Sequence, residues 1–239
     1  MSGHSHAANI AAKKAKTDAA KGKIFTKVGR EIAVAAKSNP DPDTNSKLAD
    51  AIAKAKAVNM PNENIKRCIA KAAGELSSDN YEELTYEGYG PAGSAVIIKT
   101  LTDNKNRTVD YVRTAMRKHG GSMGNSGCVS FTFSNLGVIV IERTADLDED
   151  TIMEYALDAG ADDFIAEDDA FVVHTAPASF SAVRKYLEDK GLNFFEAQVE
   201  MVPQNKITLE GDDLAKFQRL IDALEDLDDV QNVYHNVDL

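Results

Sequence analysis

The clearest fold signal of the sequence is in residues 137–202, which read GVIVIERTADLDEDTIMEYALDAGADDFIAEDDAFVVHTAPASFSAVRKYLEDKGLNFFEAQVEMV. Short apolar runs alternate here with longer segments that have apolar residues at helical spacing, and Gly160 and Gly191 each follow such a segment. The pattern predicts strands at 138–141, 164–166, 171–174 and 194–202, and helices at 150–159 and 177–190. That order, β-α-β-β-α-β, is the ferredoxin-like arrangement.

The segments on either side of this block lack strand partners of their own. From residue 81 we predict strands at 84–89 and 95–101, a helix at 107–119, and a strand in which Val129, Phe131 and Phe133 point one way. The tail predicts a strand at 207–209, a helix at 212–224 and a strand at 230–235. A lone β-α-β tail has too few partners to be stable alone. We therefore expect one split α/β domain from residues 78–133 and 206–239, with 134–205 inserted as a second, acidic ferredoxin-like domain.

Residues 1–77 are predicted to be helical. Alanine is abundant and β-branched residues are few, which favours helix. The proline-containing stretch 39–43 ends the first helix, Pro61 fits the first turn of a third helix, and Gly74 ends that helix. The apolar stripes that would form its core are Ile24, Val28, Ile32 and Ala35, then Leu48, Ala51, Ile52 and Ala55, then Ile65, Cys68, Ile69 and Ala72. The expected fold is multidomain α+β: a helical N-terminal bundle followed by two α/β domains, one inserted in the other.

Charge is distributed very unevenly along the chain. The net charge of −11 over 239 residues conceals +7 in residues 1–75, zero in 76–133 and −18 in 134–239. Residues 1–30 alone hold seven Lys and Arg against a single acidic residue, Asp18. Such a segment suits an electrostatic arm that neutralises phosphates and releases counterions. The alternatives are a solvated, lysine-bearing helix end and, with less support because Ser and Arg are sparse, a mitochondrial transit peptide.

Composition excludes several classes of protein. The longest apolar run is five residues, 32–36, so neither a membrane span nor the apolar core of a secretory signal is expected. Cys68 and Cys128 are too few for a disulfide framework or a four-ligand zinc site. We expect a cytoplasmic protein.

No catalytic or metal-binding motif is complete. The glycine-rich stretches 88–93 and 120–127 lack the Gly-Lys-Ser/Thr of a phosphate-binding loop and are predicted to be turns. Asp146, Asp148 and Asp150 have calcium-loop spacing, but Thr151 stands where that loop needs Gly. The N-terminal Ser2-Gly3-His4 could chelate Cu(II) or Ni(II) incidentally if Met1 is removed. No nucleophile has a nearby base, so we expect no enzyme activity, no cofactor and no functional metal site.

The densest polar cluster is residues 102–108, TDNKNRT, at the end of a predicted strand and the start of a helix. In a structural interpretation, Asn104 or Asn106 caps the helix by accepting from free backbone N–H groups. In a functional interpretation, Lys105 and Arg107 beside a helix N-terminus form a phosphate site.

Long motifs spread over the whole chain resemble the YebC/PmpR family, and the mitochondrial translational activator of cytochrome oxidase subunit I is similar. They are GHS at 3–5, NI at 9–10, GKIFTK at 22–27, NMP at 59–61, YEGYGP at 86–91, the 102–108 run, GG at 120–121 and DVQNVYHN at 229–236. One departure is that His6 and Ala7 stand where many members have Lys and Trp, so no aromatic side chain for base stacking occurs before Phe25.

The resemblance implies a helical N-terminal domain and two α/β domains, without catalytic residues. It implies two functions: a DNA-binding transcriptional regulator, or a translation factor that binds the ribosome and relieves stalling at stretches such as consecutive prolines. We favour the second, with ribosomal RNA or tRNA as partner, because the acidic body would be repelled by duplex DNA. Duplex DNA is the alternative, read by Asn62, Asn64 and Lys66. A protein–protein adaptor is a third interpretation.

The candidate nucleic-acid-binding residues are basic side chains of the first domain together with the polar cluster. They are Lys13, Lys14, Lys16, Lys21, Lys23, Lys27, Arg30, Lys66, Arg67, Asp103, Asn104, Asn106 and Arg107.

Overall fold

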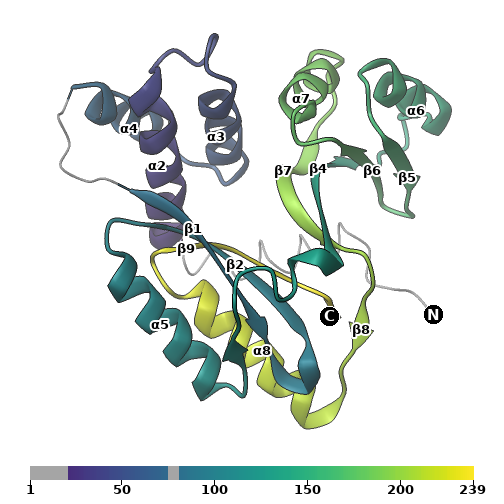
Figure 1. Cartoon of the computed structure of the whole chain (residues 1–239). Helices are drawn as coiled ribbons and strands as arrows, with labels where there is room; N and C mark the ends of the chain where they lie inside the picture. Colours follow the sequence, from purple (N-terminus) through teal and green to yellow (C-terminus); the bar gives the residue numbers. More distant parts are fainter. Residues whose placement is uncertain (1–20, 75–80) are drawn as a thin grey trace. The chain divides into compact units, whose positions relative to one another are not determined.

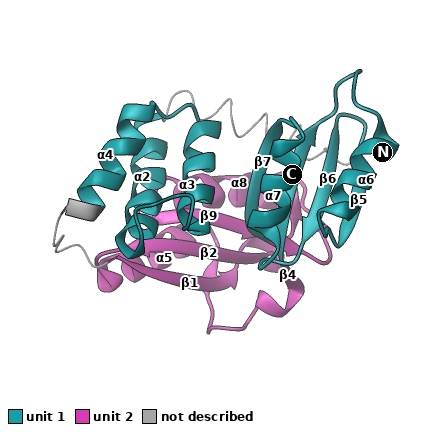
Figure 2. Ribbon diagram, turned by 90° about the horizontal axis from the view of Figure 1, so that it is seen from above, with its two compact units in different colours: residues 1–75, 135–200 teal, residues 76–134, 201–239 magenta. Residues whose placement is uncertain are grey.

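The computed structural model describes residues 21–74 and 81–239 and divides the chain into two compact units (Figure 2). Unit 1 combines residues 1–75 with 135–200, and unit 2 combines residues 76–134 with 201–239. The described part contains α-helices and two four-stranded antiparallel sheets, which confirms the predicted α+β class. The further division of unit 1 into a helical domain and a separate inserted domain stays a prediction.

Residues 21–74 of unit 1 form the helices α2 (Lys21–Ser38), α3 (Ser46–Ala57) and α4 (Asn62–Gly74) (Figure 1). Their shared core contains the predicted stripe residues, with Val28, Ile32, Leu48, Ala55 and Ile65 buried. Cys68 packs against this core, and burial raises the pKa of its thiol, with Arg67 and Lys71 acting in the opposite direction. It is a small core residue, as its place in the apolar stripe predicts.

The break between α2 and α3 is closed by one side chain. Asn45 caps α3 by accepting from the backbone N–H of Leu48 at 3.2 Å. Its amide nitrogen donates to the carbonyl oxygens of Ala35 and Asn39, at 2.9 and 2.6 Å. Because the same side chain satisfies backbone groups at the end of one helix and the start of the next, it sets the turn between them.

The inserted segment has the predicted ferredoxin-like order. Its elements are β4 (Phe133–Glu142), α6 (Glu149–Asp158), β5 (Asp163–Ala166), β6 (Ala170–Thr175), α7 (Phe180–Asp189) and β7 (Phe194–Pro203). The strands are ordered β5-β6-β4-β7, and β6 pairs antiparallel with both β4 and β5. Ile139, Ile141, Phe171 and Leu187 are buried between sheet and helices. Asp148 caps α6 through the N–H of Thr151, in line with a helix start rather than a calcium loop.

Unit 2 is built on the sheet β3-β1-β2-β9. Its elements are β1 (Glu82–Tyr89), the turn η1 (Pro91–Gly93), β2 (Ala95–Thr102), α5 (Lys105–Lys118), β3 (Ser122–Met123), β8 (Ile207–Thr208), α8 (Gly211–Glu225), β9 (Val230–His235) and β10 (Val237–Asp238). Helices α5 and α8 lie side by side against the sheet, with Met116 and Phe217 among the buried residues between them (Figure 1). Because β9 comes from the tail and pairs antiparallel with β2, the sheet needs both ends of unit 2.

The predicted strand through Val129, Phe131 and Phe133 is wrong. Residues Ser130–Thr132 form a 3₁₀ turn, η2, and the strand begins only at Phe133. Val129 and Phe133 are buried, but Phe131 is 73% exposed. Alternation of apolar residues predicted a straight strand, and a side chain from another strand bends the chain instead.

That side chain is Glu87 of β1. Its Oε1 accepts from the backbone N–H of Gly127, and its Oε2 accepts from those of Val129 and Ser130, all at 2.9 Å. Burial, the largest influence, raises the pKa of this carboxyl group, but the hydrogen bonds from Val129, Gly127 and Ser130 together outweigh it and lower the pKa. A buried carboxylate therefore replaces the neighbouring strand as hydrogen-bond partner of this loop.

We expect Glu87→Gln to lower the free energy of unfolding by about 1–3 kcal/mol, because an amide cannot accept all three backbone N–H groups. Since the carboxyl pKa is lowered by folding, its contribution is present above the ordinary glutamate pKa of about 4.3 and is lost as the pH falls through the folded value. Urea unfolding at neutral and acidic pH should show that the difference in the free energy of unfolding between wild type and variant becomes smaller as the pH falls. Glu83→Gln, at an exposed position of the same strand, is the control. A gap that does not change with pH would contradict the assignment.

Candidate nucleic-acid interface

The basic segment at residues 1–30 is described from Lys21 onward, and this part lies in helix α2. Five basic residues, Lys21, Lys23, Lys27, Arg30 and Lys37, stand on it against one acidic residue, Glu31. Lys54 of α3 neutralises Glu31 with Nζ–Oε distances of 2.8 and 3.0 Å. Lys21 and Lys23 are exposed, whereas Lys27 and Arg30 are half-buried. Lys13, Lys14 and Lys16 lie outside the described residues.

Lys66 and Arg67 are exposed on α4. Lys66 Nζ lies 3.7 Å from Glu63 Oε1, and both side chains are at least three-quarters exposed, so this ion pair is weak. Asn62 and Asn64, the candidate base-reading residues, fall in the first turn of α4 beside Glu63. The structure thus brings the candidates on α2 and α4 into one helical body.

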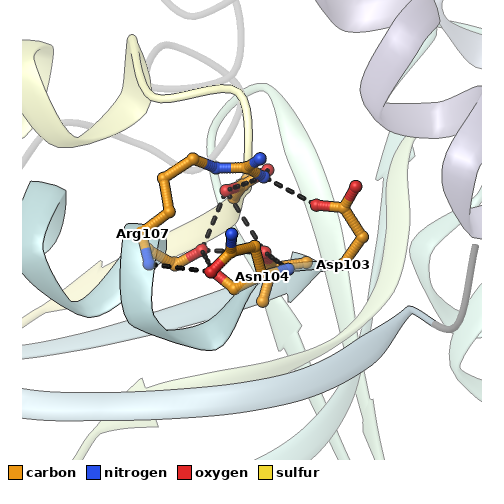
Figure 3. A network of polar contacts seen from close by, with 6 residues as sticks. Asp103, Asn104 and Arg107 are labelled. Carbon is orange, nitrogen blue, oxygen red and sulfur yellow. Dashed lines mark hydrogen bonds and ion pairs between the residues drawn. The ribbon is translucent and has the colours of Figure 1, made fainter.

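The polar cluster at residues 102–108 is a closed network (Figure 3). Asn104 is the N-cap of α5 and accepts from the backbone N–H of Arg107 at 3.1 Å, which confirms the capping interpretation for this residue. Arg107 Nη2 donates to Asp103 Oδ1 at 2.7 Å and to both carboxylate oxygens of Asp229, at 2.9 and 3.2 Å. Hydrogen bonds to Asp229 and then to Asp103 raise the pKa of Arg107, so its charge is firmly held.

Asp229 is the centre of this network, and sequence reasoning did not select it. Its side chain is 8% exposed and also accepts from the hydroxyls of Thr108 and Thr102, at 2.8 and 3.3 Å. Its carbonyl oxygen accepts from the N–H of Leu101 at 2.8 Å. A signal was present, because Asp229 immediately precedes the tail strand that was expected to join the middle segment. The 122-residue separation from Arg107 concealed the pairing.

Asn106 differs from its neighbours in this cluster. Its side chain is exposed, and within the described residues it has no hydrogen-bond partner. Arg107, in contrast, lies between two carboxylates with its side chain 38% exposed. The loop therefore combines a structural clamp with one amide that is available to a ligand.

In residues 21–74 and 81–239 no helix is long and apolar enough to cross a membrane. Within the same residues, no group of three or more His, Cys, Asp or Glu side chains is arranged to hold a metal ion.

Two family models match almost the whole chain. The model of the TACO1/YebC protein N-terminal domain matches residues 5–75. The model of the TACO1/YebC second and third domain matches residues 81–237.

Curated relatives match over nearly their full length. A protein of Acetivibrio thermocellus, named a probable transcriptional regulatory protein, is 60% identical over 99% of this chain and 98% of its own. A similarly named protein of Hathewaya histolytica is 55% identical over 100% of this chain and 97% of its own. The crystal structure of a conserved hypothetical protein from Aquifex aeolicus is 41% identical, with a TM-score of 0.81 over 93% of this chain and 92% of that one.

We expect Asp229→Asn to lower the free energy of unfolding by about 2 kcal/mol or more. The amide keeps one acceptor oxygen, but it puts an NH2 donor in place of the other and removes the negative charge opposite Arg107, so it cannot accept from Thr102, Thr108 and Arg107 together. Asp103→Asn, which alters the exposed partner of the same arginine, should cost about 1 kcal/mol or less. Urea unfolding followed by circular dichroism measures both, and equal losses for the two variants would contradict a central role for Asp229.

Proposed function

Because this chain belongs to the TACO1/YebC family, as its motifs predict, we propose that it is a nucleic-acid-binding regulatory protein that acts as a ribosome-associated translation factor. It would relieve stalling at difficult stretches such as consecutive prolines. The proposal places the protein in the cytoplasm, with ribosomal RNA or tRNA as its partner.

The observation that carries the proposal is the separation of charge. Residues 1–75 have a net charge of +7, and residues 134–239 have a net charge of −18. Lysines of the basic part can neutralise phosphates and release counterions, while the acidic part is repelled from nucleic acid. Such a protein suits a compact RNA surface recognised through its shape and backbone. A long uniform duplex offers no place for an acidic part of this size.

In this proposal the first contact is made by Lys13, Lys14, Lys16, Lys21, Lys23, Lys27, Arg30, Lys66 and Arg67. The 102–108 loop adds a second contact, in which the exposed Asn106 donates to or accepts from the RNA beside Arg107. Asp103 and Asn104 act there by positioning Arg107 and the start of α5.

The second candidate function is a duplex-DNA regulator. The names of the relatives favour it, as do Asn62 and Lys66 at the start of α4. Asn and Lys are side chains that hydrogen-bond to base edges in the major groove. The negative charge of Glu63, in the same turn, would be repelled by the DNA phosphates on either side of the groove.

Sedimentation of the purified full chain with ribosomes, beside a gel shift on duplex DNA at matched salt, separates the two functions. Binding to ribosomes without submicromolar binding to any duplex would support the translation factor. The reverse result would overturn it in favour of the regulator.

We expect reversal of Lys13, Lys14 and Lys16 to Glu to weaken ribosome binding and to flatten its dependence on salt. Each phosphate that is no longer neutralised should lower the slope of log K against log salt by roughly 0.7–0.9. The reversal of Lys185, Lys190 and Lys206 to Glu, at three exposed positions outside the proposed contacts, makes the same change in net charge and is the control. An unchanged slope in the lysine variant would mean that these residues do not touch phosphate.

We expect Asn106→Ala to weaken ribosome binding about threefold to tenfold, the loss of one hydrogen bond, with no change in the urea midpoint. The companion variant Asn104→Ala removes the helix cap and should lower stability by about 1 kcal/mol. Unchanged ribosome binding by the Asn106 variant would mean that the 102–108 loop is not part of the interface.

A further inference from the structure

A second basic surface lies in unit 2, and none of the candidate residues of the nucleic-acid interface lines it. It is a cleft of about 560 Å³ where the C-terminal end of α5, the turn η1 and the first half of α8 meet. Its charged and titratable lining residues are Arg117, Lys118, His119, Lys216 and Arg219, with Asp213 as the acidic one.

The fold holds the walls of this cleft rigidly. Helices α5 and α8 pack through buried residues such as Met116 and Leu220, which leaves Arg117, Lys118, Lys216 and Arg219 exposed at the surface. The loop between the walls is equally constrained. Gly120 ends α5 with φ of +83°, and the N–H of Gly121 donates to the carbonyl of Met116 at 2.8 Å, a Schellman-type end. A Cβ at Gly121 would lie 2.8 Å from the carbonyl oxygen of Tyr89, so the loop lies directly against β1.

The cations of the cleft form no ion pairs within residues 21–74 and 81–239. In this part of the chain, Arg117, Lys118, Lys216 and Arg219 pair with no carboxylate. Other cations of unit 2 do, since Arg107 pairs with Asp103 and Asp229, and Lys206 pairs with Asp238. The two segments of unit 2 contain 9 Lys and Arg against 15 Asp and Glu. Four of those nine cations therefore gather, with one acidic residue, in a unit that is otherwise strongly acidic.

Helix stability explains only half of this cluster. Arg117 and Lys118 stand in the last turn of α5, where cations interact favourably with the helix dipole. Lys216 and Arg219 stand away from the last turn of α8, where the dipole gives a cation no stabilisation. Unpaired like charges on two adjacent helices repel one another, so an anionic ligand bound between them would be stabilising.

We propose that this cleft binds the sugar–phosphate backbone of a folded RNA, as a contact separate from the basic helices. Two arginine forks and two lysines in a shallow, rigid cleft match consecutive phosphates better than a single small anion. The end of α8 and the residues after it carry Asp222, Glu225, Asp226 and Asp228. At 1.5 Å per residue, Asp222 and Glu225 lie about 5 and 9 Å along the helix from Arg219. A straight duplex along the helix would meet these carboxylates, whereas a turning RNA backbone would not. The inference rests on the proposed function in taking RNA as the ligand.

The test compares Lys216→Gln/Arg219→Gln with Lys185→Gln/Lys206→Gln, which removes the same charge at exposed positions elsewhere. Gln is a good helix former, so both variants should stay folded, which circular dichroism checks. The probe is a fluorescein-labelled RNA hairpin, titrated by anisotropy over a series of KCl concentrations, beside a DNA duplex with the sequence of its stem.

We expect the cleft variant to bind the hairpin about tenfold more weakly than the control variant, with a salt slope lower by roughly 0.7–0.9 for each phosphate that is no longer neutralised. Hairpin affinity and slope equal to those of the control would overturn the proposal. So would a wild-type chain that does not bind the hairpin, or a cleft variant that loses affinity for the DNA duplex but not for the RNA.

Ribosome sedimentation of the same proteins distinguishes this inference from the proposed function. Failure of the wild-type chain to sediment with ribosomes, together with a cleft-dependent loss on the hairpin, would overturn the translation role and retain the RNA cleft. If sedimentation depends on Lys13, Lys14 and Lys16 but not on Lys216 and Arg219, and the cleft variant binds the hairpin like the control, the translation role is retained and the RNA cleft is overturned.

Discussion

The carboxylate of Asp229 joins parts of unit 2 that are more than a hundred residues apart. It accepts from the end of β2 through Thr102, from the first turn of α5 through Thr108, and from Arg107. Its backbone carbonyl continues the contact by accepting from Leu101. Since β9 starts at the next residue, the network sets where the tail strand enters the sheet beside β2. The packing of unit 2 depends on that entry point, because β9 pairs with β2 of the first segment and α8 packs against α5.

The same unit shows how a buried charge can replace regular structure. Glu87 holds the loop at 127–130 with three backbone hydrogen bonds, and this loop leads into β4. Apolar alternation over 129–133 is typical of a strand, so local pattern predicted the wrong element there. The Glu87 carboxylate makes a loop possible there, because buried backbone N–H groups need a hydrogen-bond partner, and a side chain can take the place of a neighbouring strand.

The charge pattern connects the structure with the proposed function. A whole-chain charge of −11 argues against a nucleic-acid partner, yet the positive charge is gathered in the helices of residues 21–74 and in the cleft between α5 and α8. Acidic side chains elsewhere confine such contacts to these surfaces. In the proposed function, this arrangement suits a partner with a compact and irregular phosphate surface, and RNA on the ribosome would offer one.

Four features follow from the amino-acid sequence alone: the helices of residues 21–74, the β-α-β-β-α-β order of the insertion, a polar cap at the start of α5, and the charge of each segment. These follow from local periodicity, capping residues and composition, which act over a few residues. Other features depend on long-range packing: Arg107 faces Asp229, Glu87 replaces a strand, and Arg117 and Lys118 share a cleft with Lys216 and Arg219. Each of these pairings joins residues about 40 to 120 positions apart, and such contacts exist only after the sheet and its two helices have brought the segments together.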